Sequence, residues 1–227
     1  SANMQIVISP SGNVNYGTQT SSSASETNNG DSDLVYNFYR DNASIANPNT
    51  ETLNAGTYVY VYNTSGGSNY SAGSVSNTLV VNKLGNVVAL LINGEQGNLT
   101  MQYPQQINIT GSSSSGNLNL YRDNSDVSSE NSFNVSLGSG FYRYKVNSSG
   151  NQNYFANATG AELYVNITKA VSDIRLYLNN SRSNFSISQG NLFDINATLQ
   201  SGQGIIYIYK AGELIYQGSS SYHDIIN

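Results

Sequence analysis

The sequence predicts an all-β protein built from tandem antiparallel β-sandwiches. Polar and apolar residues alternate with a period of two through most of the chain, and no helical periodicity of useful length is present. The pattern also repeats about every 85 residues, which indicates a tandem array. The first two copies carry the motif L-x-x-G-x-Y, at Leu53–Tyr58 and Leu137–Tyr142. In a β-sandwich this motif fits a tyrosine corner, in which the hydroxyl of Tyr58 or Tyr142 bonds to the upstream backbone.

Equivalent residues set the expected domain boundaries. Tyr39–Asn42 recurs as Tyr121–Asn124, an offset of 82 (121 − 39), and Lys83 recurs as Lys169, an offset of 86 (169 − 83). Only the earlier strands of a copy recur after Lys169, so we expect the third sandwich to lack its last strands. The expected domains are residues 1–85, 86–170 and 171–227.

In the first copy, alternation turns Tyr58, Tyr60 and Tyr62 inward on one strand, and Tyr36 and Phe38 inward on another. An apolar strip then faces outward and predicts a contact surface. The alternative is that scattered surface apolar residues need no special explanation. The candidate contact strip is Val35, Tyr39, Val59 and Val61.

In the second copy, Arg143 and Lys145 alternate with Tyr142, Tyr144 and Val146. We expect the two charged side chains to face solvent, because burying an unpaired charge is costly. The remaining inward positions expected in this copy are Ile107, Ile109, Leu118, Leu120, Phe133, Val135, Leu137, Leu163, Val165 and Ile167.

The third copy contains no G-x-Y strand and no strand after it. A sandwich of this kind exposes an apolar groove and unpaired strand edges, which favour β-augmentation. Two explanations stay open. Either the chain is cut from a longer one, or another subunit complements the third domain with a G-x-Y-like strand or with Met4–Ser9, placed against Gly204–Lys210. The strands expected in this copy are Asp173–Leu178, Phe193–Leu199, Gly204–Lys210 and Ser221–Ile225.

Acceptor motifs for N-glycosylation, N-x-S/T, are frequent in the chain. Those at Asn108, Asn134, Asn166 and Asn196 fall on the solvent side of alternating strands, as glycosylation requires. The alternative is chance occurrence in a chain rich in Asn, Ser and Thr. The candidates are Asn42, Asn63, Asn69, Asn98, Asn108, Asn134, Asn147, Asn157, Asn166, Asn179, Asn184 and Asn196.

Composition argues against several kinds of function. The net charge of −5 and the lack of a basic stripe argue against nucleic-acid binding. The longest apolar run, Val87–Ile92, is far shorter than the roughly 20 residues that a membrane helix needs. There is no Cys, so disulfides and thiolate metal sites are excluded.

The sequence contains few candidates for chemistry. The single His223 lies next to Asp224, but adjacent strand residues face opposite ways, so the two are badly placed as a catalytic pair. No catalytic site and no bound cofactor is expected. Asn29–Asp33 has oxygen ligands at close spacing that would suit Ca²⁺, although a polar hairpin loop explains it as well. Arg40–Asn42 and Arg122–Asn124 have the composition of tight hairpin turns.

The repeated motifs resemble those of archaeal cell-surface proteins with tandem immunoglobulin-like repeats, of the S-layer, surface-filament or adhesin type. The residues that carry the resemblance are Tyr39–Asn42, Ala55–Tyr58, Asn63–Gly66, Asn69–Tyr70 and Val81–Lys83, and, in the second copy, Tyr121–Asn124, Gly140–Tyr142, Asn147–Gly150, Asn153–Tyr154 and Ile167–Lys169.

The resemblance implies immunoglobulin-like β-sandwich domains in an extracellular protein at the cell surface. We expect a non-enzymatic, N-glycosylated structural protein, a repeat unit of a cell-envelope lattice or surface filament. Its expected partners are copies of itself or other envelope proteins, together with N-linked glycans. Two alternatives remain: the stalk of an adhesin, or an accessory module of a larger secreted enzyme.

Overall fold

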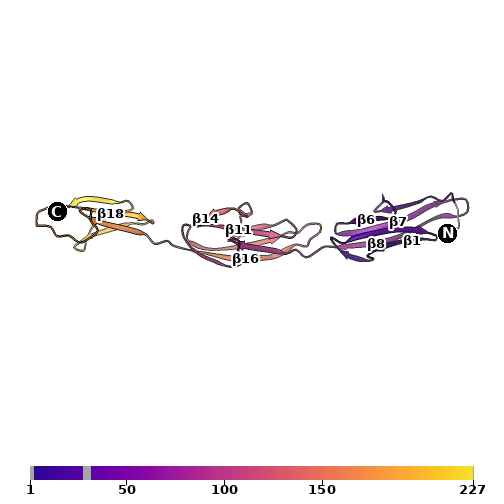
Figure 1. Cartoon of the computed structure of the whole chain (residues 1–227), viewed down its shortest axis with the longest axis horizontal. Helices are drawn as coiled ribbons and strands as arrows, with labels where there is room; N and C mark the ends of the chain where they lie inside the picture. Colours follow the sequence, from indigo (N-terminus) through magenta and orange to yellow (C-terminus); the bar gives the residue numbers. More distant parts are fainter. Residues whose placement is uncertain (1–2, 28–31, 227) are drawn as a thin grey trace. The chain divides into compact units, whose positions relative to one another are not determined.

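The computed structural model describes residues 3–27 and 32–226. These residues form β-strands and one short 3₁₀ turn, η1 (Ser128–Glu130), so the all-β prediction is confirmed. The strands that the structure describes make six sheets, two in each sequence repeat, and each repeat forms its own sandwich-like body (Figure 1).

The first repeat packs a three-stranded sheet, β1-β3-β6, against a five-stranded sheet, β2-β8-β7-β4-β5. Neighbouring strands are antiparallel except β2, which is parallel to β8. Strands A, B and E of an immunoglobulin-like sandwich thus face A′, G, F, C and C′. The strands are β1 (Met4–Ser9), β2 (Asn13–Asn15), β3 (Gln19–Glu26), β4 (Tyr36–Arg40), β5 (Ala43–Ser44), β6 (Asn49–Thr52), β7 (Gly56–Gly66) and β8 (Ser71–Asn82).

Aromatic residues dominate the core of the first repeat. Tyr60 and Tyr62 are buried, and the ring of Phe38 lies 5.9 Å from that of Tyr60 and 6.1 Å from that of Tyr62. The inner face of β3 carries Thr20 and Ser22 instead of large apolar residues. Sequence analysis missed β3 for this reason, since its alternation is between small polar residues.

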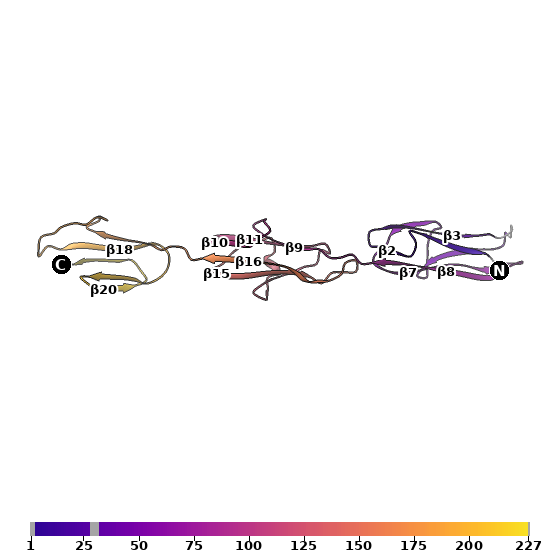
Figure 2. The same cartoon turned by 90° about the horizontal axis from the view of Figure 1, so that it is seen from below.

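The second repeat has the same arrangement, with sheets β14-β11-β9 and β10-β16-β15-β12-β13. In Figure 2, β15 and β16 lie side by side, as β7 and β8 do in the first repeat. The strands are β9 (Val88–Ile92), β10 (Leu99–Gln102), β11 (Gln106–Ser113), β12 (Asn119–Arg122), β13 (Ser125–Asp126), β14 (Asn134–Ser136), β15 (Gly140–Ser148) and β16 (Asn157–Thr168).

The expected core of the second repeat is largely present, with one error. Ile107, Ile109, Tyr144 and Val146 are each at most 1 % exposed. Phe133, which we expected to point inward, is 67 % exposed. The backbone explains the error: Phe133 N donates to the Glu130 carbonyl in a turn that follows η1, so the residue precedes β14 and does not share its alternation.

The third repeat has two smaller sheets, β17-β18-β21 and β19-β20. Its described strands correspond to A, B, E, C and C′ of the other repeats. Its inward residues are less covered: Leu176 is 48 % exposed, whereas the equivalent Leu90 is 3 % exposed. The strands are β17 (Asp173–Leu178), β18 (Phe193–Ser201), β19 (Ile206–Lys210), β20 (Glu213–Gly218) and β21 (Tyr222–Ile226).

The chain forms two compact units whose boundaries differ from those of the sequence repeats. One compact unit contains residues 1–98, 107–135 and 142–164, and the other contains residues 99–106, 136–141 and 165–227. The division passes through the second sandwich. The first repeat is therefore grouped with the part of the second repeat that carries the loop between β15 and β16.

Candidate functional site

The loop between β15 and β16 joins the first two repeats. We call its residues Asn151–Phe155 the junction loop. The backbone of Leu84 accepts from Phe155 N and donates to the Asn153 carbonyl, both at 2.9 Å. The side chain of Asn153 accepts from Ala55 N at 2.8 Å and donates to Asn54 Oδ1 at 3.0 Å. Each such bond contributes about 0.5–1.5 kcal/mol net.

Two further contacts complete the junction. Lys83 Nζ donates to the carbonyl of Asn151 at 2.9 Å. The ring of Tyr154 packs edge-on against Tyr16, with centroids 5.9 Å apart. The residues of the first repeat that hold the junction loop are Tyr16, Asn54, Ala55, Lys83 and Leu84.

The sequence marks these positions without revealing their contact. Asn153 and Tyr154 repeat Asn69 and Tyr70, and Lys83 is repeated as Lys169, so all of them serve as repeat markers. Nothing in the pattern shows that the loop of one repeat binds the end of the previous one, because such a contact depends on tertiary structure.

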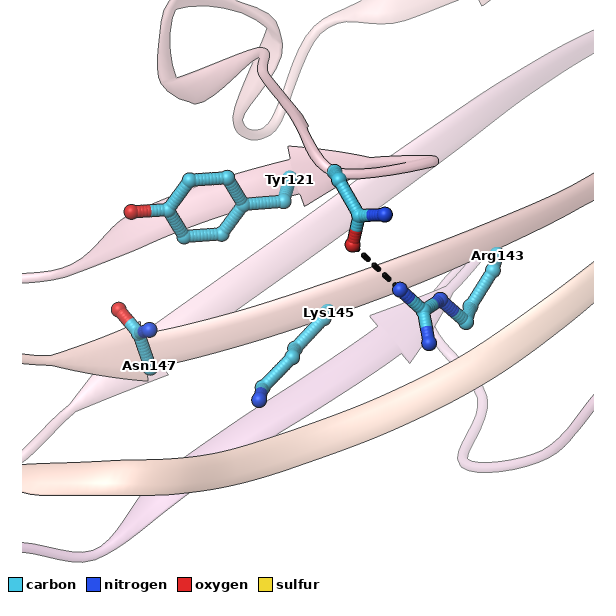
Figure 3. A pocket seen from close by; sticks show the side chains of 5 residues that line it. Tyr121, Arg143, Lys145 and Asn147 are labelled. Atoms are coloured by element: carbon cyan, nitrogen blue, oxygen red, sulfur yellow. Dashed lines mark hydrogen bonds between the residues drawn. The ribbon is translucent and has the colours of Figure 1, made fainter.

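A polar pocket of about 200 Å³ lies on the outer face of the large sheet of the second repeat (Figure 3). Tyr121 and Lys145 face each other across β12 and β15, and Asn147 follows on β15. The guanidinium of Arg143 donates to Asn124 Oδ1 and lies 3.8 Å from a carboxylate oxygen of Glu162. Arg143 and Lys145 are half-buried on this outer face, as the alternation predicted.

The equivalent face of the first repeat is apolar. Tyr39 faces Val61 across β4 and β7, and Val59 follows along β7 with 42 % exposure. Val35 precedes β4, on the far side of the cross-strand pair Asn37–Asn63. The candidate contact strip is thus divided into a group of three residues and a separate Val35.

The two D-N turns have the same role in both repeats. Asp41 and Asn42 have φ of 48° and 67°, and Asp123 and Asn124 have φ of 50° and 70°. These are the positive values that a two-residue hairpin turn needs. The carboxylate of Asp41 accepts from Val59 N at 2.9 Å, and that of Asp123 accepts from Arg143 N at the same distance. The prediction of turns is confirmed.

The two tyrosine-corner candidates lie at equivalent positions of the first two repeats. Tyr58 Oη donates to the carbonyl of Asn54 at 2.8 Å, four residues upstream. Burial raises the pKa of Tyr58, and nearby Arg40 opposes the shift. Tyr142 lies at the equivalent position on β15 and is partly buried.

His223 pairs with an acid that sequence analysis did not select. Its Nε2 lies 2.8 Å from Asp194 Oδ1, whereas the neighbouring Asp224 accepts a bond from the Tyr222 hydroxyl. The partner comes from β18, where Asn196 faces His223. Only the register between β18 and β21 shows this pair. The His223 side chain is 62 % exposed, so the pair lies at the surface.

The candidate calcium loop lies partly outside the described residues, since Asn29, Gly30 and Asp31 are not among them. Asp33 is described, and its Oδ2 accepts from the backbone N and the hydroxyl of Ser68. Within residues 3–27 and 32–226, no group of three or more His, Asp or Glu side chains gathers to hold a metal ion.

The glycosylation candidates differ in how their side-chain amides are used. Asn108 Nδ2 donates to the Ser132 carbonyl at 3.0 Å, and Asn157 Nδ2 donates to the Asn86 carbonyl at 2.9 Å. A glycan replaces one hydrogen of Nδ2, so modification at these two sites competes with internal hydrogen bonds. Asn134 is exposed on β14, and its Oδ1 accepts a hydrogen bond from Asn108 Nδ2. Attachment of a glycan to Asn134 Nδ2 would not compete with that bond, because the bond is made by the other atom of the amide.

Known proteins show only distant similarity to this chain. No protein-family model and no curated protein matches the chain. Fibronectin(III)-like modules of Clostridium thermocellum CbhA share 15 % identity, over 73 % of this chain and 95 % of theirs, with a TM-score of 0.28. Sidekick-1 immunoglobulin domains 1-5 share 12 % identity, over 98 % of this chain and 53 % of theirs, with a TM-score of 0.38. In the part of the chain that the structure describes, no helix has the length and apolar character to cross a membrane.

Proposed function

We propose that this chain is a non-enzymatic, N-glycosylated structural protein of the cell surface, a repeat unit of an envelope lattice (S-layer) or a surface filament of the archaeal type. The observation that carries the proposal is the junction between the first two repeats. Four backbone or amide hydrogen bonds, the bond from Lys83 and the Tyr16–Tyr154 contact join consecutive sandwiches directly. Such contacts suit a protein whose task is to transmit mechanical load between domains.

The surface supports an extracellular location. Asn108, Asn166 and Asn196 alternate with the buried residues Ile107, Val165 and Ile195, and Asn134 is exposed on β14, so these four glycosylation candidates face solvent. Charged residues make up only 10 % of the chain, well below the roughly 25 % of an average soluble domain. Glycans would supply the solubility that charges supply elsewhere.

Imaging of native material tests the structural role. Negative-stain electron microscopy of purified envelopes, with an antibody against this chain, should show label on ordered sheets or fibres. Label on isolated projections with a separate tip would instead identify the stalk of an adhesin. Label found only on a secreted enzyme, and not on the envelope, would identify an accessory module and contradict the proposal.

Mass spectrometry of the same material tests glycosylation site by site. We expect the native protein to exceed the mass of the bare polypeptide, with higher occupancy at Asn134 than at Asn108 or Asn157, whose Nδ2 groups are hydrogen-bonded. A native mass equal to that of the bare polypeptide would refute glycosylation.

A further inference from the structure

The polar pocket on the outer face of the second repeat contains a cation that has no partner. Lys145 lines the pocket and is half-buried, and none of the described residues hydrogen-bonds to its ammonium group or pairs with its charge. The neighbouring Arg143, by contrast, donates to Asn124 Oδ1 and lies 3.8 Å from a carboxylate oxygen of Glu162. Because a half-buried charge is costly to leave unpaired, the pocket has one positive charge that an anionic ligand would neutralise.

Two further side chains offer contacts that a simple ion would not use. Tyr121 faces Lys145 across β12 and β15, and Figure 3 shows both of them, with Asn147, around the same pocket. Asn147 Oδ1 accepts from Asn119 Nδ2 at 3.3 Å, so Asn147 Nδ2 can donate to a ligand. A tyrosine ring presents an apolar surface, on which the C–H face of a sugar can pack. The pocket thus combines a cation, an amide donor and an aromatic ring.

The size and position of the pocket suit one residue of an extended polymer. Its volume of about 200 Å³ is below the roughly 300–1,000 Å³ of sites that enclose a drug-sized ligand. Arg143, Lys145 and Asn147 follow one another on the outer side of β15, with about 7 Å between successive members of the row. Because the pocket lies on the outer face of a sheet, a polymer can continue past it on either side.

The first repeat has the same lining except for the two cations, which are valines there. The equivalent pairs are Tyr39 and Tyr121, Asn42 and Asn124, Asn63 and Asn147, Val59 and Arg143, and Val61 and Lys145. The first repeat forms the same hairpin turn and the same strand pairing without the cations. The fold therefore does not require Arg143 and Lys145, which favours a role for them in binding.

We propose that this pocket binds an acidic polysaccharide, a polymer that contains uronic acid residues. Lys145 pairs with the uronate carboxylate, Asn147 Nδ2 donates to a ring hydroxyl, and the sugar ring packs on Tyr121. Arg143 adds positive potential beside them. The single excess charge of the pocket suits a carboxylate better than a phosphate group, which carries a charge of about −1.5 to −2. This binding activity is additional to the proposed structural role and does not depend on it.

Asn147 is also a glycosylation candidate, and a glycan on its Nδ2 would fill the same pocket. Modification of Asn147 and binding of the polysaccharide therefore exclude each other. Asn147 is half-buried, whereas Asn134 is exposed, which makes Asn147 the less accessible acceptor. The binding experiment uses the full chain made without glycosylation, so that the pocket is open in every molecule.

Titration of the isotope-labelled full chain with an oligogalacturonate, followed by two-dimensional NMR, tests the proposal. An open site of this size binds weakly, so we expect a Kd on the order of 1 mM. The shifts should centre on the amides of Tyr121, Lys145 and Asn147. The methyl-esterified oligomer has the same rings without the charges and should bind about tenfold more weakly or less. Equal affinity for the two oligomers would overturn the proposal, and equal affinity for an oligomer of glutamic acid would identify an acidic-peptide site instead.

Removal of the unpaired charge tests the role of Lys145. Lys145→Met retains most of the side-chain stem and should weaken binding of the oligogalacturonate about tenfold or more. Lys169→Met, the same change at an exposed lysine of the same repeat, is the matched control and should bind as the wild type does. The spectra also show whether each variant is folded. Unchanged affinity in Lys145→Met would overturn the proposal.

Transfer of the cations to the first repeat gives a sharper test. Val59→Arg/Val61→Lys places them beside Tyr39 and Asn63, which already stand at the equivalent positions. The variant should acquire a second site, seen as additional shifts of the β7 amides on titration with the oligogalacturonate. A folded variant without these additional shifts would overturn the proposal, because the groups named here would then be insufficient for binding.

Discussion

The first and second repeats have the same strand arrangement, but their outer faces differ in polarity. At equivalent positions of β7 and β15, Val59 and Val61 of the first repeat are replaced by Arg143 and Lys145 of the second. Beneath these faces, Tyr60 and Tyr144 occupy the same buried position, at 1 % and 0 % exposure. The turns that precede the two faces also make the same bond, from the backbone N of Val59 or Arg143 to an Asp carboxylate.

The comparison shows which residues specify the fold. The inner faces, the D-N turns and the equivalent glycines Gly66 and Gly150 are retained in both repeats. The outer face changes from apolar to cationic without any change in strand order. The outer face is therefore available for functions that differ between repeats, and the core and turns carry the structural information. Substitutions in the core, at the junction and on the outer faces test whether the core and turns specify the fold while the outer face is free to vary.

Truncation of the shared core tyrosine should have the largest effect. Tyr60→Ala and Tyr144→Ala each remove a fully buried aromatic ring, and loss of a ring of this kind costs about 3–5 kcal/mol. Urea unfolding followed by far-UV circular dichroism should show an early transition for one repeat and leave the rest nearly unchanged. Equal loss of signal from all repeats in a single early transition would show that the repeats are not separate folding units.

The junction should show the next largest effect. Asn153→Ala removes the bond accepted from Ala55 N and the bond donated to Asn54, and leaves a partly buried N–H without its partner, which costs about 1–3 kcal/mol. Limited proteolysis should then cut faster near Leu84. Asn69→Ala, at the equivalent but exposed position, is the control and should leave the rate of cleavage unchanged. Equal protection in both variants would contradict the role assigned to Asn153.

Sequence analysis predicted the inner faces well because period-two alternation determines them directly. The inward triplet Tyr58, Tyr60 and Tyr62 and the outward pair Arg143 and Lys145 follow from residue type alone. It failed where tertiary contacts decide. Phe133 lies in a turn set by η1, which breaks the alternation, and the β3 strand is packed by small polar residues.

The candidate site was harder to predict for a related reason. Asn153 and Tyr154 were visible as repeated residues, but their contact with Leu84 joins parts of the chain about 70 residues apart, and no local pattern encodes it. The His223–Asp194 pair was missed because it depends on the register between β18 and β21.

Alkaline titration should weaken both repeats through their buried tyrosines. Burial raises the pKa of Tyr62 in the first repeat, with Glu26 adding to the shift. It also raises the pKa of Tyr144 in the second, where the hydrogen bond from Arg122 opposes it. A raised pKa in the folded state means that the unfolded chain loses its protons first. The stabilisation is thus complete below pH about 10 and declines as the pH rises above that value.

The tyrosine contributions are separated by substitution. Tyr62→Phe and Tyr144→Phe each retain the ring and remove one titrating hydroxyl, so each variant should show a shallower fall of unfolding free energy as the pH rises above about 10. Urea unfolding at a series of pH values measures this slope. A slope in either variant that equals that of the wild type would exclude the tyrosine as a source of the alkaline instability.

Exchange of the outer faces should have the smallest effect and is the most direct test of the comparison. The two exchanges are Val59→Arg/Val61→Lys in the first repeat and Arg143→Val/Lys145→Val in the second. The first exchange should change the free energy of unfolding by no more than about 0.5 kcal/mol, the range for surface positions away from special features. The second exchange also removes the contact of Arg143 with Glu162, which is at the surface and contributes about 0–1 kcal/mol. Urea midpoints that match the wild type would show that these faces are free to vary with function. A loss of several kcal/mol in either exchange would show instead that Val59 and Val61, or Arg143 and Lys145, take part in specifying the fold.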